Sequence, residues 1–168
     1  MKNRCLKEES GFTLIELVLI ITVAATLAAM ASVGLDSLGS SRSSGAARRL
    51  VSDLRFAQQA AITKRIRHGI TFTANAYTVF ENDNSADPAR NPQGGGDFIV
   101  DFTTGEFAGV TLGTSLGDSV IRFDANGRPL EGNPPNPVTA LATPETVTLT
   151  YNGNPQTVTI MQETGKVN

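Results

Sequence analysis

The feature that most constrains this chain is a 19-residue stretch without a charged side chain, which runs from Leu17 to Leu35. As an α-helix it would be about 28 Å long, close to the thickness of the hydrocarbon core of a bilayer. One carboxylate, Glu16, lies at its start. An unpaired carboxylate in such a segment costs on the order of 3 kcal/mol. We therefore expect a transmembrane helix from Leu17 to Leu35 and a partner for Glu16.

A cleaved secretory signal is the first alternative for this stretch. Such a signal has an apolar core of about 7–15 residues, followed by a cleavage site with small residues. Here the apolar stretch is longer, and the small residue, Gly11, precedes it. Cleavage at Gly11 would leave the apolar helix on the mature protein. A lipoprotein signal through Cys5 does not fit either, because no apolar region precedes this cysteine.

Residues 11–17, Gly-Phe-Thr-Leu-Ile-Glu-Leu, follow a short polar leader. This combination resembles the class III signal of type IV prepilins and pseudopilins. The resemblance implies cleavage after Gly11 by a prepilin peptidase and N-methylation of the new terminus, Phe12. It also implies that Glu16 pairs with the terminal amine of a neighbouring subunit. Both groups are charged at neutral pH, and their pairing in an apolar filament core would fix axial register. A plain membrane anchor with a snorkelling glutamate is the alternative.

Basic residues near the apolar stretch do not decide its orientation. They lie on both sides of it, so the positive-inside rule is almost balanced. These residues are Lys2, Arg4, Lys7, Arg42, Arg48 and Arg49. The orientation comes from the resemblance, which implies a single pass through the cell inner membrane, a cytoplasmic N-terminus and a periplasmic C-terminal domain.

The stretch after the apolar segment, residues 36–45, is rich in glycine and serine, which are weak helix formers. It is either a hinge or a strained part of one long helix. From residue 46 to residue 67, apolar residues such as Leu50 and Leu54 recur at helical spacing, which predicts an amphipathic helix that packs on a sheet. The predicted solvent face carries Arg48, Arg49, Asp53, Arg55, Gln59 and Lys64.

From residue 68 onward, β-branched and aromatic residues alternate with polar ones, which is typical of strands. Strands are predicted around Ile70 and around Tyr77, and then at 98–103, 107–112, 120–124, 146–151 and 157–161. Asn-Gly-Asn-Pro at 152–155 predicts a hairpin, whereas 82–97 and 127–144 are predicted loops. The expected fold class is α+β: a long N-terminal transmembrane and amphipathic helix, then an antiparallel β-sheet domain, as in pilins.

Four parts of the chain follow from this pattern. They are a cleaved leader, a transmembrane or filament-core helix, a hinge with an amphipathic periplasmic helix, and a β-rich periplasmic domain. Their expected bounds are 1–11, 12–35, 36–67 and 68–168.

Two stretches after the apolar segment indicate which branch of the prepilin and pseudopilin family the chain resembles. Residues 50–57 (Leu-Val-Ser-Asp-Leu-Arg-Phe-Ala) and 121–129 (Ile-Arg-Phe-Asp-Ala-Asn-Gly-Arg-Pro) are similar to the domain of H-type minor pseudopilins and FimT-like minor pilins. This implies a minor pseudopilin of a type II secretion system, part of a periplasmic pseudopilus that drives export of folded proteins. Implied partners are other pseudopilins or pilins, a prepilin peptidase and an inner-membrane assembly platform. The alternative is a FimT-like minor pilin of a type IV pilus with a role in DNA uptake.

A basic cluster within residues 42–67 suggests a different class of partner. Arg48, Arg49 and Arg55 are candidate DNA contacts, because DNA binding needs a solvent-facing cationic patch. However, Asp53 interrupts the cluster, and the whole chain has a formal net charge of −2. A solvated helix face explains these arginines as well, so we do not expect a nucleic-acid partner.

Two short patterns suggest chemistry but lack its context. Gly-Thr-Ser-Leu-Gly at 113–117 matches a hydrolase elbow, yet a strand follows it and the only histidine, His68, precedes it. Asp83, Ser85 and Asp87 begin like a calcium loop, but a proline stands where the turn glycine should be. We predict an inter-strand turn and a solvated acidic loop there, and a helix-terminal role for His68. No catalytic residue, metal or cofactor is expected, and the chain is not expected to be an enzyme.

Overall fold

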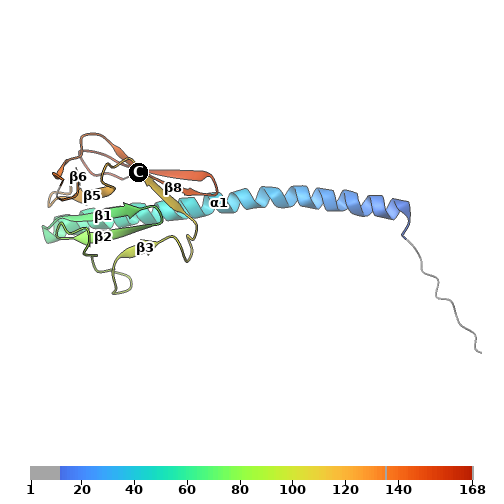
Figure 1. Ribbon diagram of the computed structural model, residues 1–168, viewed down its shortest axis with the longest axis horizontal. Helices are drawn as coiled ribbons and strands as arrows, with labels where there is room; N and C mark the ends of the chain where they lie inside the picture. The colour runs from blue at the N-terminus through green and yellow to red at the C-terminus, as the bar shows by residue number, and fades with distance from the viewer. Residues whose placement is uncertain (1–11, 135, 168) are drawn as a thin grey trace, which may run out of the picture. The chain divides into compact units, whose positions relative to one another are not determined.

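The computed structural model describes residues 12–134 and 136–167, and of residues 31–39 it describes the backbone alone. The chain divides into two units, one that ends at Leu38 and one that begins at Gly39. The described chain has one helix, α1 (Leu14–Lys64), followed by nine strands (Figure 1). This order confirms the expected α+β class with its N-terminal helix.

Both ends of α1 have a local cause. At its start, the Glu16 amide donates to the carbonyl and the hydroxyl of Thr13, at 3.1 and 3.3 Å, so Thr13 is the N-cap. At its end, Arg65 has a φ of 57°, which a helix does not accommodate. The helix therefore ends three residues before the predicted residue 67. Residues 36–45 are helical and belong to α1, and the hinge expected there stays a prediction.

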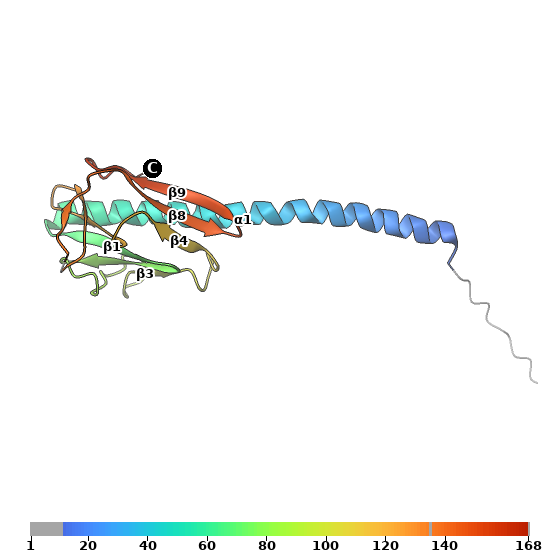
Figure 2. The same cartoon turned by 45° about the horizontal axis from the view of Figure 1, so that its top comes forward.

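The strands form two antiparallel sheets (Figures 1 and 2). The larger sheet has the order β3-β2-β1-β5-β6-β7, and the smaller has the order β4-β8-β9. The larger sheet consists of β1 (His68–Thr73), β2 (Ala76–Glu81), β3 (Ile99–Asp101), β5 (Val120–Phe123), β6 (Pro129–Glu131) and β7 (Thr139–Ala140). The smaller sheet consists of β4 (Thr111–Thr114), β8 (Glu145–Tyr151) and β9 (Asn154–Ile160).

Some predicted strand positions are confirmed and others are wrong. The hairpin is confirmed, with Tyr151 opposite Asn154 across the turn. The strand predicted at 107–112 is displaced, because Phe107 instead packs its ring on Phe102 at a centroid distance of 6.3 Å. The stretch from residue 107 is hydrophobic because Phe107 packs in this way, and β4 begins only at Thr111. The predicted loop at 127–144 contains the short strands β6 and β7, which carry too few residues for a recognisable alternation.

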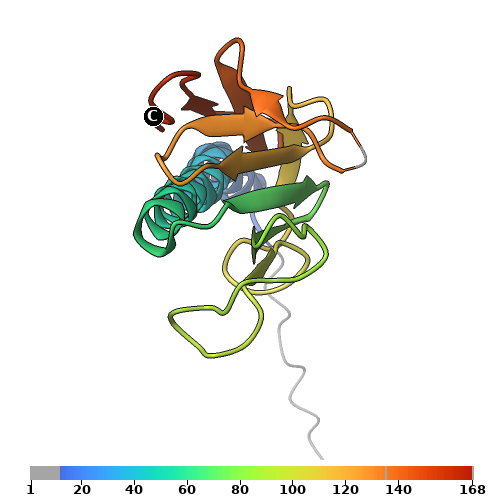
Figure 3. The same ribbon diagram turned by 90° about the vertical axis from the view of Figure 1, so that its left-hand side faces the viewer.

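The core of the domain is made of side chains from the C-terminal part of α1 and from both sheets. Figure 3 looks along α1 and shows the strands beside this part of the helix. Leu50, Leu54 and Ala57 are fully buried on the helix side. Ile70 and Tyr77 from the larger sheet and Leu149 from the smaller sheet meet them there. The helix face predicted from the spacing of leucines and alanines is therefore the packed face.

Candidate functional site

The N-terminal part of α1 presents apolar side chains to its surroundings on every side. Phe12 and Leu14 are 76% and 81% exposed, and Met30 is 75% exposed. The hydroxyls of two threonines in this part are hydrogen-bonded to the helix backbone. Thr22 donates to the Leu19 carbonyl at 2.9 Å, and Thr26 donates to the Val23 carbonyl at 2.8 Å. A helix that is apolar all round needs an apolar environment, such as lipid or other helices.

The predicted processing and assembly residues lie at the start of this helix. Phe12 and Glu16 are both exposed, with Glu16 in the first turn of α1. The cleavage residue Gly11 lies outside the described residues. The structure adds one role that our sequence analysis missed. Thr13 and Glu16 stand at the N-cap and third helical positions, the spacing of a capping box, which was readable as Thr-x-x-Glu.

Among residues 12–134 and 136–167, no helix has the length and hydropathy needed to cross a bilayer. The expected span from Leu17 to Leu35 reaches into residues 31–39, whose side chains lie outside the description. Membrane insertion of this helix stays a prediction.

Asp53 does not lie on the solvent face predicted for it. Its side chain is 7% exposed and accepts hydrogen bonds from the Tyr77 hydroxyl at 2.6 Å and from Arg49 Nε at 2.9 Å. The prediction failed because helical spacing ignores a polar partner supplied by a distant strand. Burial, and then the Asp53 charge, raise the pKa of Tyr77 far above its usual range. The hydrogen bond to Asp53 likewise raises the pKa of Arg49.

The other arginines of the basic cluster differ in their partners. Arg42 donates to the Tyr151 hydroxyl at 3.0 Å and stacks over its ring, 5.1 Å from the centroid. Arg55 donates through Nη2 to the Val167 carbonyl at 3.1 Å. Arg48 is exposed, and no described residue pairs with it by an ion pair or hydrogen bond. Of the three candidate DNA contacts, Arg49 is thus paired with Asp53, while Arg48 and Arg55 have no carboxylate partner among the described residues.

His68 lies in β1, not at the end of the helix, so the predicted interaction with the helix dipole is wrong. Its ring is buried, with Nε2 3.4 Å from Glu81 Oε2. Lys64 Nζ lies 2.8 Å from the same oxygen. The Lys64 hydrogen bond lowers the pKa of Glu81. The ion pair between Lys64 and Glu81 therefore connects the end of α1 to β2.

A buried arginine organises the loops that were predicted to be simply solvated. Arg122 is fully buried and donates to the carbonyl of Gly132 and, at 2.8 Å, to Asn133 Oδ1. Its Nε lies 3.5 Å from Asp83 Oδ1, while Arg67 contacts the other oxygen of Asp83 at 2.8 Å. Burial lowers the pKa of Arg122. Asp83, the first residue of the calcium-like pattern, is thus occupied by two arginines.

The hydrolase-like pattern lies at the end of β4. Ser115 accepts a hydrogen bond from the Thr146 amide at 2.9 Å and donates to Glu145, so its hydroxyl joins β4 to β8. Within the described part of the chain, no three His, Cys, Asp or Glu side chains are arranged to hold a metal ion.

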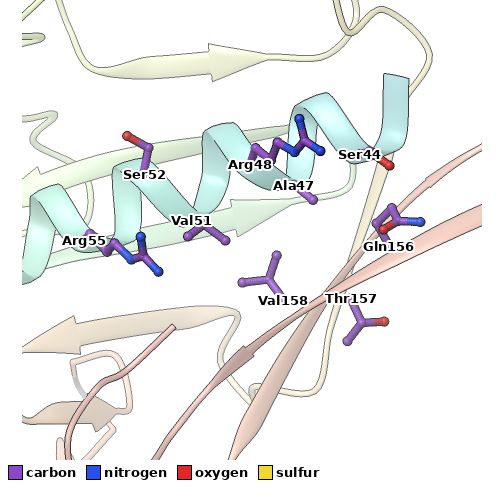
Figure 4. Close-up of a pocket in the computed structure, with 9 residues that line it drawn as sticks. All are labelled: Ser44, Ala47, Arg48, Val51, Ser52, Arg55, Gln156, Thr157 and Val158. Carbon is purple, nitrogen blue, oxygen red and sulfur yellow. The ribbon is translucent and has the colours of Figure 1, made fainter. Parts of the chain in front are cut away.

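One groove runs between α1 and β9, with a volume of about 480 Å³ (Figure 4). Val51 of the helix and Val158 of the strand face each other across it. Its residues come from one stripe of α1 and from the middle of β9. They are Ser44, Ala47, Arg48, Val51, Ser52, Arg55, Gln156, Thr157 and Val158.

Together, the helix-plus-sheet fold and the exposed apolar side chains near the N-terminus of α1 define a pilin-like assembly subunit. The fold resembles that of a solved type IV minor pilin, FimU of Pseudomonas aeruginosa, with a TM-score of 0.51 and 19% identity over 75% of this chain and 86% of that one. The minor pseudopilin EpsH of Vibrio cholerae gives a TM-score of 0.49 and 15% identity over 76% of this chain and 94% of that one. No curated protein matches.

A family model described as "Type II transport protein GspH" matches residues 46–165. The chain belongs to this GspH family, which confirms the predicted class of H-type pseudopilin and its function as a minor pseudopilin of type II secretion. Pseudopilins are structural subunits that are membrane-anchored in the periplasm and assemble with one another into a filament.

Proposed function

We propose that this chain is inserted in the inner membrane by the helix from Leu17 to Leu35, with its N-terminus in the cytoplasm and its domain in the periplasm. A prepilin peptidase cleaves it after Gly11, Phe12 is methylated, and an inner-membrane platform feeds it into the pseudopilus. The observation that carries this proposal is the ring of exposed apolar side chains on the N-terminal part of α1. Removing them from water requires lipid first and neighbouring helices later.

Glu16 is the residue to which we assign axial register. The carboxylate at the edge of an apolar helix bundle is stabilised when it meets a terminal amine. Sequencing the mature N-terminus from purified membranes tests the processing step: the first residue should be a methylated Phe12. A mature chain that still carries residues before Phe12 contradicts the assignment.

A deletion strain separates the secretion machine from the alternative, a type IV pilus minor pilin with a role in DNA uptake. Its culture supernatant, surface pili and DNA uptake are compared with those of the parent strain. We expect exported proteins to remain in the periplasm while pili and DNA uptake stay normal. Normal export together with lost pili or lost transformation would move the chain to the pilus.

A further inference from the structure

Strand β9 has an unpaired edge next to the groove. It is an outer strand of its sheet, and β8 is its neighbour among the described strands. Paired residues in an antiparallel ladder alternate between hydrogen-bonded and non-hydrogen-bonded, and the pair that closes a two-residue hairpin is hydrogen-bonded. Since Tyr151 and Asn154 close this hairpin, the backbone of Thr157 faces away from β8. Pro155 has the same outward orientation, which suits a residue without an N–H group.

Only the far end of this edge is covered by the described residues. Ile160 forms a bridge with Val167 near the C-terminus. The backbone N–H and carbonyl of Thr157, which lines the groove, find no partner among the described residues. An extended segment placed in the groove could therefore add to the sheet as a further strand.

The helix wall of the groove is cationic. Arg48 and Arg55 lie on the stripe of α1 that borders it, and none of the nine lining residues is acidic. Arg48 also borders an adjacent hollow with Glu106, but no ion pair joins them. A ligand with carboxylates would neutralise both arginines, and its apolar side chains would contact the partly exposed Val51.

We propose that this groove binds an extended acidic strand of a neighbouring pseudopilin, which pairs with the backbone of Thr157 and places carboxylates against Arg48 and Arg55. The inference rests on the proposed function, because a filament neighbour supplies the strand. A free strand edge recognises a peptide backbone, whereas DNA needs only exposed cations. The edge at Thr157 therefore favours a peptide over DNA.

The test uses the full processed protein in detergent and a synthetic end-blocked peptide of about seven residues that alternates glutamate with valine. We expect this peptide to bind and to slow hydrogen exchange of the Thr157 amide by at least about tenfold. A peptide with lysine in place of glutamate, and one with N-methylated amides, should bind at least about tenfold more weakly.

Protein variants locate the binding site. Arg48→Glu should weaken peptide binding by at least about tenfold, whereas Arg128→Glu, a charge reversal at an exposed arginine that does not line the groove, should leave it within about twofold. Thr157→Pro removes the outward N–H and should also weaken binding, as Pro155 is already tolerated on this edge.

Three results would overturn the proposal. They are no binding of the acidic peptide to the wild type, unchanged binding to Arg48→Glu and Thr157→Pro, or an unprotected Thr157 amide in the complex. Displacement of the peptide by a DNA duplex with higher affinity would assign Arg48 and Arg55 to DNA instead. The binding assay needs no secretion machinery, so a failure here is distinct from normal export in the deletion strain.

Discussion

At the scale of single residues, the domain is fixed by a few polar side chains that are buried and paired. Asp53 receives two hydrogen bonds in the core, and Arg122 makes its contacts with no exposed surface. A buried charge is tolerated only when its partners are in place. Such residues are therefore sensitive points for substitution.

Tyr77→Phe tests this sensitivity. The ring would still fill its site, but Asp53 would lose its hydrogen bond at 2.6 Å. We expect a loss of about 1–3 kcal/mol in the free energy of unfolding, measured by thermal unfolding with circular dichroism. Tyr151→Phe is the control, since Tyr151 is only half-buried and its hydroxyl partner Arg42 is exposed. Equal losses in the two variants would argue against a special role for the buried pair.

At the scale of elements, the close packing of β1 against its two neighbours depends on Gly69. A β-carbon there would lie 2.9 Å from Phe80 Cε1 and closer still to the carbonyl of Ile121. Gly69→Ala should therefore destabilise the domain by about 1–3 kcal/mol. Gly113, in β4, has no atom within 4 Å of the same position, so Gly113→Ala should keep or slightly raise the melting temperature. The opposite order would refute the packing argument.

The junction of α1 with β2 predicts a pH dependence. The hydrogen bond from Lys64 lowers the pKa of Glu81. A lowered carboxyl pKa adds stability above the pKa of the unfolded state, about 4.3, and this stability is lost as the pH falls through the folded-state value. Between pH 6 and pH 3, the melting temperature of Glu81→Gln should fall less than that of the wild type. Parallel curves would show that the ion pair contributes little.

At the scale of the whole molecule, the backbone amide of Glu16 takes part in the cap of the N-terminal helix, while we assign its carboxylate to pairing with a neighbouring subunit. Glu16→Val should be processed and inserted, yet fail to co-purify with other pseudopilins, because the terminal amine of its neighbour loses its partner. Thr13→Ala is the matched control. It removes the N-cap hydrogen bond, worth about 1 kcal/mol, but keeps the carboxylate. Because Glu16→Val keeps the backbone amide that Thr13 caps, normal assembly of Glu16→Val would contradict the pairing role, and poor assembly of Thr13→Ala would show that the cap is needed as well.

Much of this architecture was predictable because its signals are local. The apolar stretch after Glu16, the helical spacing of Leu50 and Leu54, and the hairpin at Asn152 and Gly153 each depend on residues close in sequence. Strand β4 was misplaced because the aromatic Phe107 packs on a distant ring instead of joining a strand. Strands β6 and β7 were missed because each is too short to show an alternation of apolar and polar residues.

The sequence by itself determined the class of protein, since a polar leader, a small residue, Glu16 and a long apolar stretch occur together in one short segment. Only the tertiary structure decided that Asp53 is buried with Tyr77 and that Arg122 holds the loop residue Asp83. The groove between α1 and β9 also belongs to the tertiary structure. These features join residues far apart in the chain, and helical or strand periodicity reports only which face is apolar, not which partner will meet it.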